Sequence, residues 1–362
     1  MKTSLPPSRI VPVAALERFT VEALRRLGVT AADAQTTTDA LVMADTWGTF
    51  THGTKLLVGY LRRLRGGGIR TDVRPAVLSD GPAWAIVDGG SALGQVIGTF
   101  AMETAVNKAR SAGISYVGVR NSNHFGAAGY YPWLAARQGL LGVAMCNDMP
   151  SVVAPGARRA VTGTNPIAFA LPCGDRPPVL LDIAISTVAG GKVYVARQLG
   201  KPIAPDWLID SAGQPTTDGS LYPDHAALAP MGGHKGYGLA LLVEALSGVL
   251  SGAAVTWQVG SWIWGDTSKP TGHGAAFLAI DVAAMAPGDE FPRRMRALID
   301  EIHATPAAAG SDGVLLPGER EWRNRERALA EGIPLPPDVV AALTSAAEEA
   351  GIAPPWQDDA PR

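Results

Sequence analysis

Apolar runs of strand length alternate with helix-length segments through the middle of the chain. The runs AWAIVDGG, ISYVGVR, LLGVAMC, PIAFALP, PVLLDIAIS and AAFLAID have the length and composition of β-strands. Between them, GQVIGTFAMETAVNKARSAG and KGYGLALLVEALSGVLSG have the length and apolar content of helices. Strands and helices that alternate in this way pack into layers. The sequence therefore predicts an α/β fold.

Helical segments flank this middle part at both ends. Near the N-terminus, VAALERFTVEALRRLG repeats apolar residues at helical spacing and ends at Gly28. Three further helices are predicted after about residue 287. A chain of 362 residues is long enough for more than one structural unit. We expect an N-terminal helical segment at 1–75, a central α/β domain at 76–284 and a C-terminal helical segment at 285–362.

The composition and the spacing of particular residues argue against several classes of protein. The formal net charge of −2 provides no basic excess for nucleic acid. Histidines do not occur as H-x-H or HExxH, so we expect no metal site. Cys146 and Cys173 lie in apolar runs, as small core residues do. The N-terminus lacks a signal-peptide pattern, and the longest apolar segment contains Glu244 and is too short to span a bilayer, so we expect a cytoplasmic protein.

The glycine-rich stretches do not follow the usual dinucleotide pattern. The chain contains neither G-x-G-x-x-G nor G-x-x-x-x-G-K-[ST]. Gly90, Gly94 and Gly98 occur at other intervals, which favours tight turning and close helix packing. In GGHKGYG, a helix start carries Lys235, which suits anion binding and an ordinary glycine-rich helix entry about equally. Any nucleotide site in this chain is therefore not of the Rossmann kind.

Polar residues and two histidines stand next to predicted strands and helices. Asp182 ends a strand in LDIAIST, where α/β sheets place ligands, although a surface loop has the same composition. His52 precedes a helix in FTHG, and His124 follows a strand in NSNHFG. A histidine acts as a general acid or base only when it lies beside the reacting group. Spacing alone leaves a catalytic and a structural role open for both histidines.

Eight motifs occur together in the order and spacing of one known family. They are ADTWGTFTHG, YLRRLRGGGI, NSNHFGAAGYY, GTNPIAFALP, LDIAIST with GGK, DWLIDSAGQPTTD, GGHKGYGLALLVEALSGVLSG and LLPGERE. They span from about residue 40 to about residue 320. With these motifs the chain resembles the malate/L-lactate dehydrogenase-like family of non-Rossmann, NAD(P)-dependent oxidoreductases. Among the members of that family it is most similar in character to ureidoglycolate dehydrogenase.

The resemblance implies a fold and a function. It implies a large mixed β-sheet wrapped by helices, with the N- and C-terminal helical segments packed together, and a homodimer with active sites near the subunit interface. The central domain would bind NAD or NADP and carry the catalytic residues. The implied reaction transfers a hydride between this cofactor and a small 2-hydroxy acid or 2-oxo acid.

The resemblance also assigns residues to the site. His124 would give a proton to the substrate or take one from it, and His52 would help to polarise the substrate from the other side. Thr51, Lys55 and Leu56 would lie at the substrate. The implied cofactor-binding residues are Asp148, Thr164, Asn165, Asp182, Ile183, Ala184, Ser186, Lys192, His234, Lys235, Gly236, Pro317, Gly318 and Glu319.

One position departs from the family pattern. The family usually has S-H-G-x-x-R, whose arginine grips a substrate carboxylate, and the matching residue here is Leu56. Lys55 is adjacent, but one residue along a helix turns a side chain by about 100°. Thr51 replaces the serine and keeps the hydroxyl. Either another cation holds the carboxylate, or the substrate has no carboxylate at this place.

Two alternatives remain beside the hydroxy-acid reaction. A reductase of the C=N bond in a cyclic imino acid would use the same proton-donating histidine. A nucleotide-binding family member without turnover is the other, and Leu56 is the argument for it. The presence of His52, His124, Asp182 and Lys235 together argues against it, because a degenerate site need keep none of them.

Overall fold

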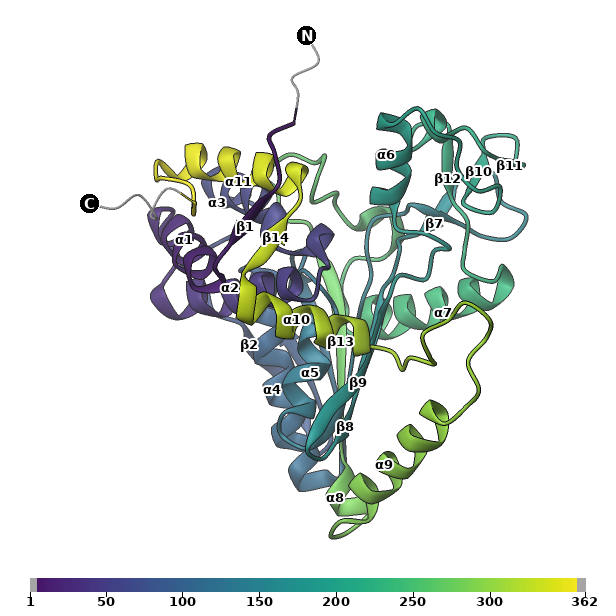
Figure 1. Cartoon of the computed structure of the whole chain (residues 1–362). Helices are drawn as coiled ribbons and strands as arrows, with labels where there is room; N and C mark the ends of the chain where they lie inside the picture. The colour runs from purple at the N-terminus through teal and green to yellow at the C-terminus, as the bar shows by residue number, and fades with distance from the viewer. Residues whose placement is uncertain (1–4, 357–362) are drawn as a thin grey trace.

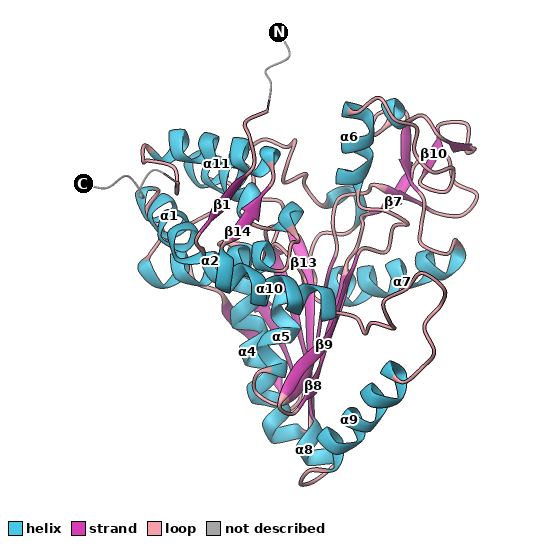
Figure 2. Cartoon of the chain, viewed as in Figure 1, coloured by secondary structure: helices cyan, strands magenta, loops and turns pink. Residues whose placement is uncertain are grey.

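The structure, a computed structural model that describes residues 5–356, has the α/β architecture that the alternation predicts (Figures 1 and 2). A seven-stranded sheet in the order β2-β3-β4-β13-β5-β8-β9 forms its centre. Strands β3 and β4 are parallel and the other neighbours are antiparallel, so the sheet is mixed, as expected. The strands are β2 (Ala76–Gly81), β3 (Trp84–Asp88), β4 (Ile114–Ser122), β5 (Leu140–Cys146), β8 (Ile167–Cys173), β9 (Arg176–Ile183) and β13 (His273–Asp281).

Helices cover both faces of this sheet. Helices α4 (Gly94–Ala112) and α5 (Tyr130–Ala136) pack on one face over the largest apolar core. Gly98 of α4 allows this close packing, because a Cβ there would lie 2.5 Å from the ring of Tyr131. On the other face, α7 (His234–Glu244) continues into the π-helical turn η4 (Ala245–Val249). The close packing of Gly98 against Tyr131 confirms the predicted role of this glycine in helix packing.

The terminal helical segments pack together, as expected from the resemblance. Strand β1 (Arg9–Val11) pairs with β14 (Ile333–Leu335), and α3 packs against α11. A shared apolar core joins the two ends of the chain. The helices are α1 (Val13–Arg26), α2 (Ala31–Thr46), α3 (Leu57–Gly66), α10 (Glu319–Glu331) and α11 (Pro337–Ala350). Helix α8 (Val282–Met285) follows β13 directly, and α9 (Glu290–His303) packs against β8 of the large sheet.

A second, five-stranded sheet was not predicted. Its strands are only two or three residues long, too short for an apolar alternation to stand out in the sequence. The order is β11-β10-β12-β6-β7, with α6 (Gly190–Gln198) beside it at the upper right of Figure 1. The strands are β6 (Val152–Val153), β7 (Ala160–Thr162), β10 (Leu208–Asp210), β11 (Pro215–Thr216) and β12 (Ala226–Leu228). This small sheet faces the terminal helices across the end of the large sheet (Figure 1).

The described residues include no helix that is both long enough and apolar enough to cross a membrane. Cys146 and Cys173 are buried free thiols, as predicted for small core residues.

Candidate active site

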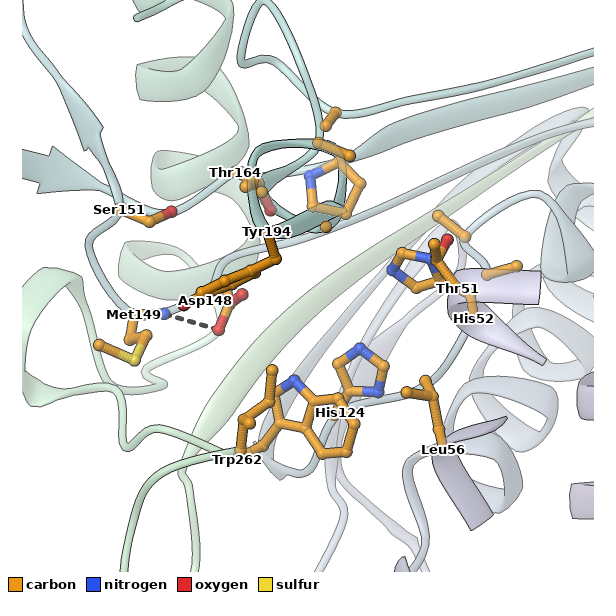
Figure 3. A pocket seen from close by; sticks show the side chains of 18 of the residues that line it. Thr51, His52, Leu56, His124, Asp148, Met149, Ser151, Thr164, Tyr194 and Trp262 are labelled. Atoms are coloured by element: carbon orange, nitrogen blue, oxygen red, sulfur yellow. Dashed lines mark hydrogen bonds between the residues drawn. The ribbon is translucent and has the colours of Figure 1, made fainter. Parts of the chain in front are cut away.

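A pocket of about 2000 Å³ lies between the terminal helices, the end of the large sheet and the small sheet (Figure 3). Its wall is assembled from segments that are far apart in the sequence. They are the short helices η1 (Phe50–His52) and η2 (Thr54–Leu56), the ends of β4, β5 and β9, helix α6, segment 261–267 and the start of α10. Both histidines singled out in the sequence, His52 and His124, line this pocket.

His124 is held at the end of β4 by close backbone packing. Gly94 opens α4 directly against it, and a Cβ on this glycine would lie 2.4 Å from the carbonyl oxygen of His124. The Asn123 amide donates hydrogen bonds to the carbonyl oxygens of Ser91 and Ala92, at 3.0 and 2.9 Å. The backbone that carries His124 is therefore fixed from two sides.

Three aromatic side chains surround the ring of His124. The Tyr60 hydroxyl lies 2.7 Å from His124 Nδ1. The Trp262 ring stacks on the imidazole with centroids 4.1 Å apart, and the His52 ring stacks at 5.8 Å. Thr51 Oγ1 in turn lies 2.9 Å from His52 Nδ1. Sequence reasoning identified His124 and missed Tyr60 and Trp262, although Tyr60 opens the quoted motif YLRRLRGGGI.

Burial sets the charge of both histidines. It lowers the pKa of His124 well below the ordinary 6.5, and neighbouring His52 and His273 lower that pKa further. Burial also lowers the pKa of His52, against the opposing influence of Asp148. At neutral pH, His124 is therefore a neutral imidazole. Its partner, the Tyr60 hydroxyl, can donate to Nδ1 or accept from it, so it serves both charge states of the ring.

A buried carboxyl group supports the segment that carries His52. Asp45 Oδ2 accepts hydrogen bonds from the backbone N–H and the hydroxyl of Thr54, at 2.9 and 2.6 Å. Gly53 lies over this carboxyl, and a Cβ there would come within 1.8 Å of Asp45 Oδ1. Burial raises the pKa of Asp45 to about 7. Only glycine at position 53 leaves room for this contact, which fixes the chain directly after His52.

A second network links the far side of the pocket to the His124 segment. His273 Nε2 lies 3.1 Å from Asp148 Oδ1, and His273 Nδ1 lies 2.7 Å from Thr271 Oγ1. The Thr271 hydroxyl donates to Asn123 Oδ1 at 2.9 Å. His273 is buried in β13, and the sequence gave no signal for its contact with Asp148 because 125 positions separate them.

The pocket brings together about half of the cofactor residues expected from the resemblance. Among them, Asp182 Oδ2 accepts a hydrogen bond of 2.7 Å from the backbone N–H of Gly129. Gly318 packs against Leu180, and a Cβ there would lie 2.8 Å from the Cβ of Leu180. The expected residues that line the pocket are Asp148, Thr164, Asp182, Ile183, Ala184, Pro317 and Gly318.

The other expected cofactor residues do not line it. Asn165 is buried behind the wall, where its amide donates to Glu244 Oε2 at 2.9 Å and its Oδ1 accepts from the backbone N–H of Asp148 at 3.2 Å. The Ser186 hydroxyl donates to the carbonyl oxygen of Val188. Glu319 lies 2.7 Å from His303 Nε2. Lys192, His234 and Lys235 are exposed and do not line the pocket, and Gly236 packs against Met231. A role for these residues in cofactor binding stays a prediction.

The three expected substrate residues, Thr51, Lys55 and Leu56, all line the pocket. Lys55 Nζ lies 2.6 Å from Asp338 Oδ2 on α11, so this ammonium group already has a partner. Figure 3 shows Leu56 and Trp262 on opposite sides of His124.

The pocket has the size and the donor groups for a dinucleotide. Its volume exceeds the several hundred Å³ of an ordinary small-molecule site. The buried Ser151 hydroxyl oxygen on its wall has no hydrogen-bond partner among residues 5–356, so a polar ligand group would satisfy it. Arg158, Arg159 and Arg197 also line the pocket and provide positive charge for phosphates. Polar and charged groups of this kind fit NAD or NADP.

Comparisons with known proteins agree on one family. The family model described as malate/L-lactate dehydrogenase matches residues 11–344. The malate dehydrogenase of Pyrococcus horikoshii is 38% identical over 349 residues, which cover 94% of this chain and 96% of that protein. The L-sulfolactate dehydrogenase of Methanocaldococcus jannaschii is 37% identical over 85% of this chain and 88% of its own length. The ureidoglycolate dehydrogenase of Escherichia coli K12 is 33% identical over 89% of this chain and 91% of its own length.

Solved structures show the same relationship. The malate dehydrogenase structure from Pyrococcus horikoshii superposes with a TM-score of 0.87 at 35% identity and covers 98% of this chain and 99% of that one. The sulfolactate dehydrogenase structure from Methanocaldococcus jannaschii superposes with a TM-score of 0.88 at 34% identity and covers 95% and 98% of the two chains.

Proposed function

The chain belongs to the malate/L-lactate dehydrogenase family, and from this premise we propose that it interconverts a small 2-hydroxy acid and its 2-oxo acid with NAD or NADP. It is an oxidoreductase that acts on CH–OH groups, as its relatives' names as dehydrogenases indicate. The observation that carries the finer proposal is the half-buried His124, held by Tyr60 on the wall of a pocket large enough for a dinucleotide.

His124 handles the substrate proton in this proposal. When bound, a nicotinamide ring supplies or accepts the hydride. Oxidation of an alcohol releases a proton from its oxygen, and neutral His124 is the group suited to accept it. In the reverse direction the imidazolium returns that proton to the oxygen. The Tyr60 hydroxyl keeps the ring in one orientation. Its oxygen accepts from Nδ1 in both charge states, because the neutral ring that takes up a proton at Nε2 carries its own proton on Nδ1.

His52 and the residues around the pocket take supporting roles. His52 would polarise the substrate oxygen from the other side, with its Nδ1 held by Thr51 at 2.9 Å. Asp148, Thr164 and Asp182 would bind the cofactor with Ile183, Ala184, Pro317 and Gly318, and Ser151 adds a free hydroxyl. Placing these groups before substrate arrives is what lets a weak acid or base act efficiently.

Reduction of a C=N bond in a cyclic imino acid is the second candidate. It is favoured by one relative, the Δ1-pyrroline-2-carboxylate/Δ1-piperideine-2-carboxylate reductase of Pseudomonas putida, which is 33% identical over 89% of this chain and 92% of its own length. The same histidine would give its proton to the imine nitrogen. A binding protein without turnover is less well supported. Such a protein would not need to order His124 against Tyr60 and His52.

The active form is proposed to be a homodimer. Exposed apolar side chains lie on α7, on η4 and directly after η4, where a second copy would cover them. They are Leu239, Leu241, Leu242, Val249 and Leu250. Light scattering should give twice the chain mass, and Leu242→Glu should shift it toward the single chain. A monomeric wild-type protein would contradict this part of the proposal.

The experiment that tests the function follows nicotinamide absorbance over time. The purified protein is mixed with NADH or NADPH and with 2-oxo acids or cyclic imino acids. Loss of absorbance with 2-oxo acids supports the proposed reaction and identifies the cofactor. Loss only with cyclic imines supports the second candidate. If no compound causes a loss of absorbance while fluorescence shows that NADH or NADPH binds, both candidate reactions would be contradicted.

A further inference from the structure

The part of the pocket wall next to His124 is apolar, and the basic side chains beside it are bound to other groups of the protein. We define the α3 wall by the lining residues Leu56, Val58, Gly59, Trp262 and Ala342. Three basic side chains, Lys55, Arg62 and Arg63, also line the pocket at this wall. Each of them already binds oxygen atoms of the protein itself.

Two of these cations are in ion pairs with the C-terminal helix. Lys55 Nζ lies 2.6 Å from Asp338 Oδ2, and Arg62 Nε lies 3.0 Å from Glu349 Oε1. Both acidic residues belong to α11, which packs against α3 and η2. Recruiting Lys55 for a substrate anion would take this counter-charge from Asp338, whereas Glu349 also pairs with Arg65.

Arg63 is bound to backbone carbonyl groups and not to a carboxylate. Its guanidinium donates to the carbonyl oxygens of Trp262, Lys269 and Ser261, at 2.8, 3.1 and 2.6 Å. The side chain is buried and 2% exposed. These three bonds fix segment 261–269 and hold the Trp262 ring over His124 and Tyr60, with centroid distances of 4.1 and 5.7 Å. Gly59 leaves room for this ring, because a Cβ there would lie 3.1 Å from it.

We propose that the preferred substrate presents an apolar or aromatic group, and not a second carboxylate or a sulfonate, to the α3 wall. This inference rests on the proposed dehydrogenase function and names its substrate class. On both sides of His124, Leu56 and Trp262 provide surfaces against which an apolar substrate group can pack. An anionic group at the same place would be desolvated beside cations that already bind oxygen atoms of the protein.

The proposal separates this chain from the relatives that are named for malate and sulfolactate. Malate and sulfolactate each carry a second anion, as a carboxylate and a sulfonate. A branched or aromatic 2-oxo acid carries a hydrocarbon group in its place.

The test compares kcat/KM for matched 2-oxo acids with the wild-type protein and reduced nicotinamide. The apolar pair is 4-methyl-2-oxopentanoate and phenylpyruvate, and the dianionic pair is oxaloacetate and sulfopyruvate. We expect kcat/KM for the better apolar compound to exceed kcat/KM for either dianion by at least about tenfold. This is the size of effect that one hydrophobic contact gives in an enzyme pocket. A dianion that equals or exceeds the apolar compounds would overturn the inference while leaving the dehydrogenase function intact.

Variants test whether the substrate preference depends on the α3 wall. Leu56→Arg should shift the ratio toward oxaloacetate by about tenfold or more, because its guanidinium offers a fork for a carboxylate. Trp262→Ala should lower kcat/KM for phenylpyruvate more than for pyruvate. Leu329→Arg on the exposed side of α10 adds the same charge outside the pocket and should leave the ratio unchanged. An unchanged ratio in Leu56→Arg would overturn the assignment of this wall. If no 2-oxo acid or cyclic imine is turned over while cofactor binds, the proposed function fails and the inference falls with it.

Discussion

The hydroxyl of Tyr60 on α3 lies 2.7 Å from Nδ1 of His124 at the end of β4, and the two residues are 64 positions apart. This hydrogen bond couples the terminal helices to the large sheet at the centre of the pocket. It leaves the other ring nitrogen, Nε2, to exchange a proton with a substrate. The Tyr60 hydroxyl is buried, and burial raises its pKa, so it remains protonated across the working range of a dehydrogenase.

Removing that hydroxyl should weaken catalysis without unfolding the protein. Tyr60→Phe keeps the ring that stacks near Trp262 and removes only the oxygen. We expect kcat to fall by about 10- to 100-fold, because the His124 ring loses the partner that orients it. Steady-state kinetics at saturating cofactor measure the change, and thermal unfolding provides the control. An unchanged kcat in a folded variant would mean that this bond does not position His124.

Removing the imidazole should cost turnover far more than cofactor affinity. His124→Ala is expected to lower kcat by about 10²- to 10⁴-fold, the contribution of a positioned general acid or base. Binding of NADH or NADPH, followed by fluorescence, should change little because the expected cofactor residues lie on other segments. Collapse of cofactor binding together with normal residual turnover would show that the role assigned to His124 is wrong.

The depressed pKa of His124 fixes the expected pH profile. A group that acts as a base works above its pKa, and activity is lost as the pH falls through that value. Burial lowers the pKa of His124 well below 6.5. For alcohol oxidation, kcat/KM should therefore be flat through neutral pH and fall only on the acid side. The measurement covers about pH 5 to pH 8.5. An acid limb centred at neutral pH or above would contradict a depressed pKa for the base.

Asp45 should make the stability of the protein depend on pH. Its pKa rises from 3.8 to about 7 in the folded chain, so the folded state binds this proton more tightly than the unfolded state. Its contribution to stability is therefore complete below about 3.8 and is lost as the pH rises to about 7. Asp45→Asn removes the titration and keeps an oxygen for the Thr54 N–H.

The difference in free energy of unfolding between Asp45→Asn and wild type should thus move in favour of the variant from pH 4 to pH 8, by about 4 kcal/mol. Urea unfolding at the two pH values gives this difference, and titrations at other sites cancel in it. An identical difference at both pH values would show that Asp45 does not titrate in this range.

Arg63 should be needed for the order of segment 261–269. Arg63→Lys keeps the charge but replaces a planar group with three carbonyl partners by a single ammonium group. We expect faster proteolytic cleavage within the segment and a loss of stability of about 1–3 kcal/mol. Arg26→Lys, on the exposed surface of α1, is the matched control. Cleavage as slow as in wild type would mean that Arg63 does not hold the segment.

The sequence by itself determined the fold class, the family and the two histidines. These depend on patterns that can be read locally, such as strand and helix periodicity and the eight ordered motifs from about residue 40 to about residue 320. It also identified Leu56 as the position that departs from the family pattern. The five-stranded sheet was missed because its strands are two or three residues long.

Only the tertiary structure decided what surrounds these residues. Lys55 is paired with Asp338, 283 positions away, and Arg63 holds the backbone of Trp262, 199 positions away. Asp148 meets His273 across 125 positions. A motif specifies the identity of a side chain, but contacts between distant segments depend on how the helices and sheets pack. That packing set the charge of His124, occupied the cations of the α3 wall and placed Trp262 over the ring.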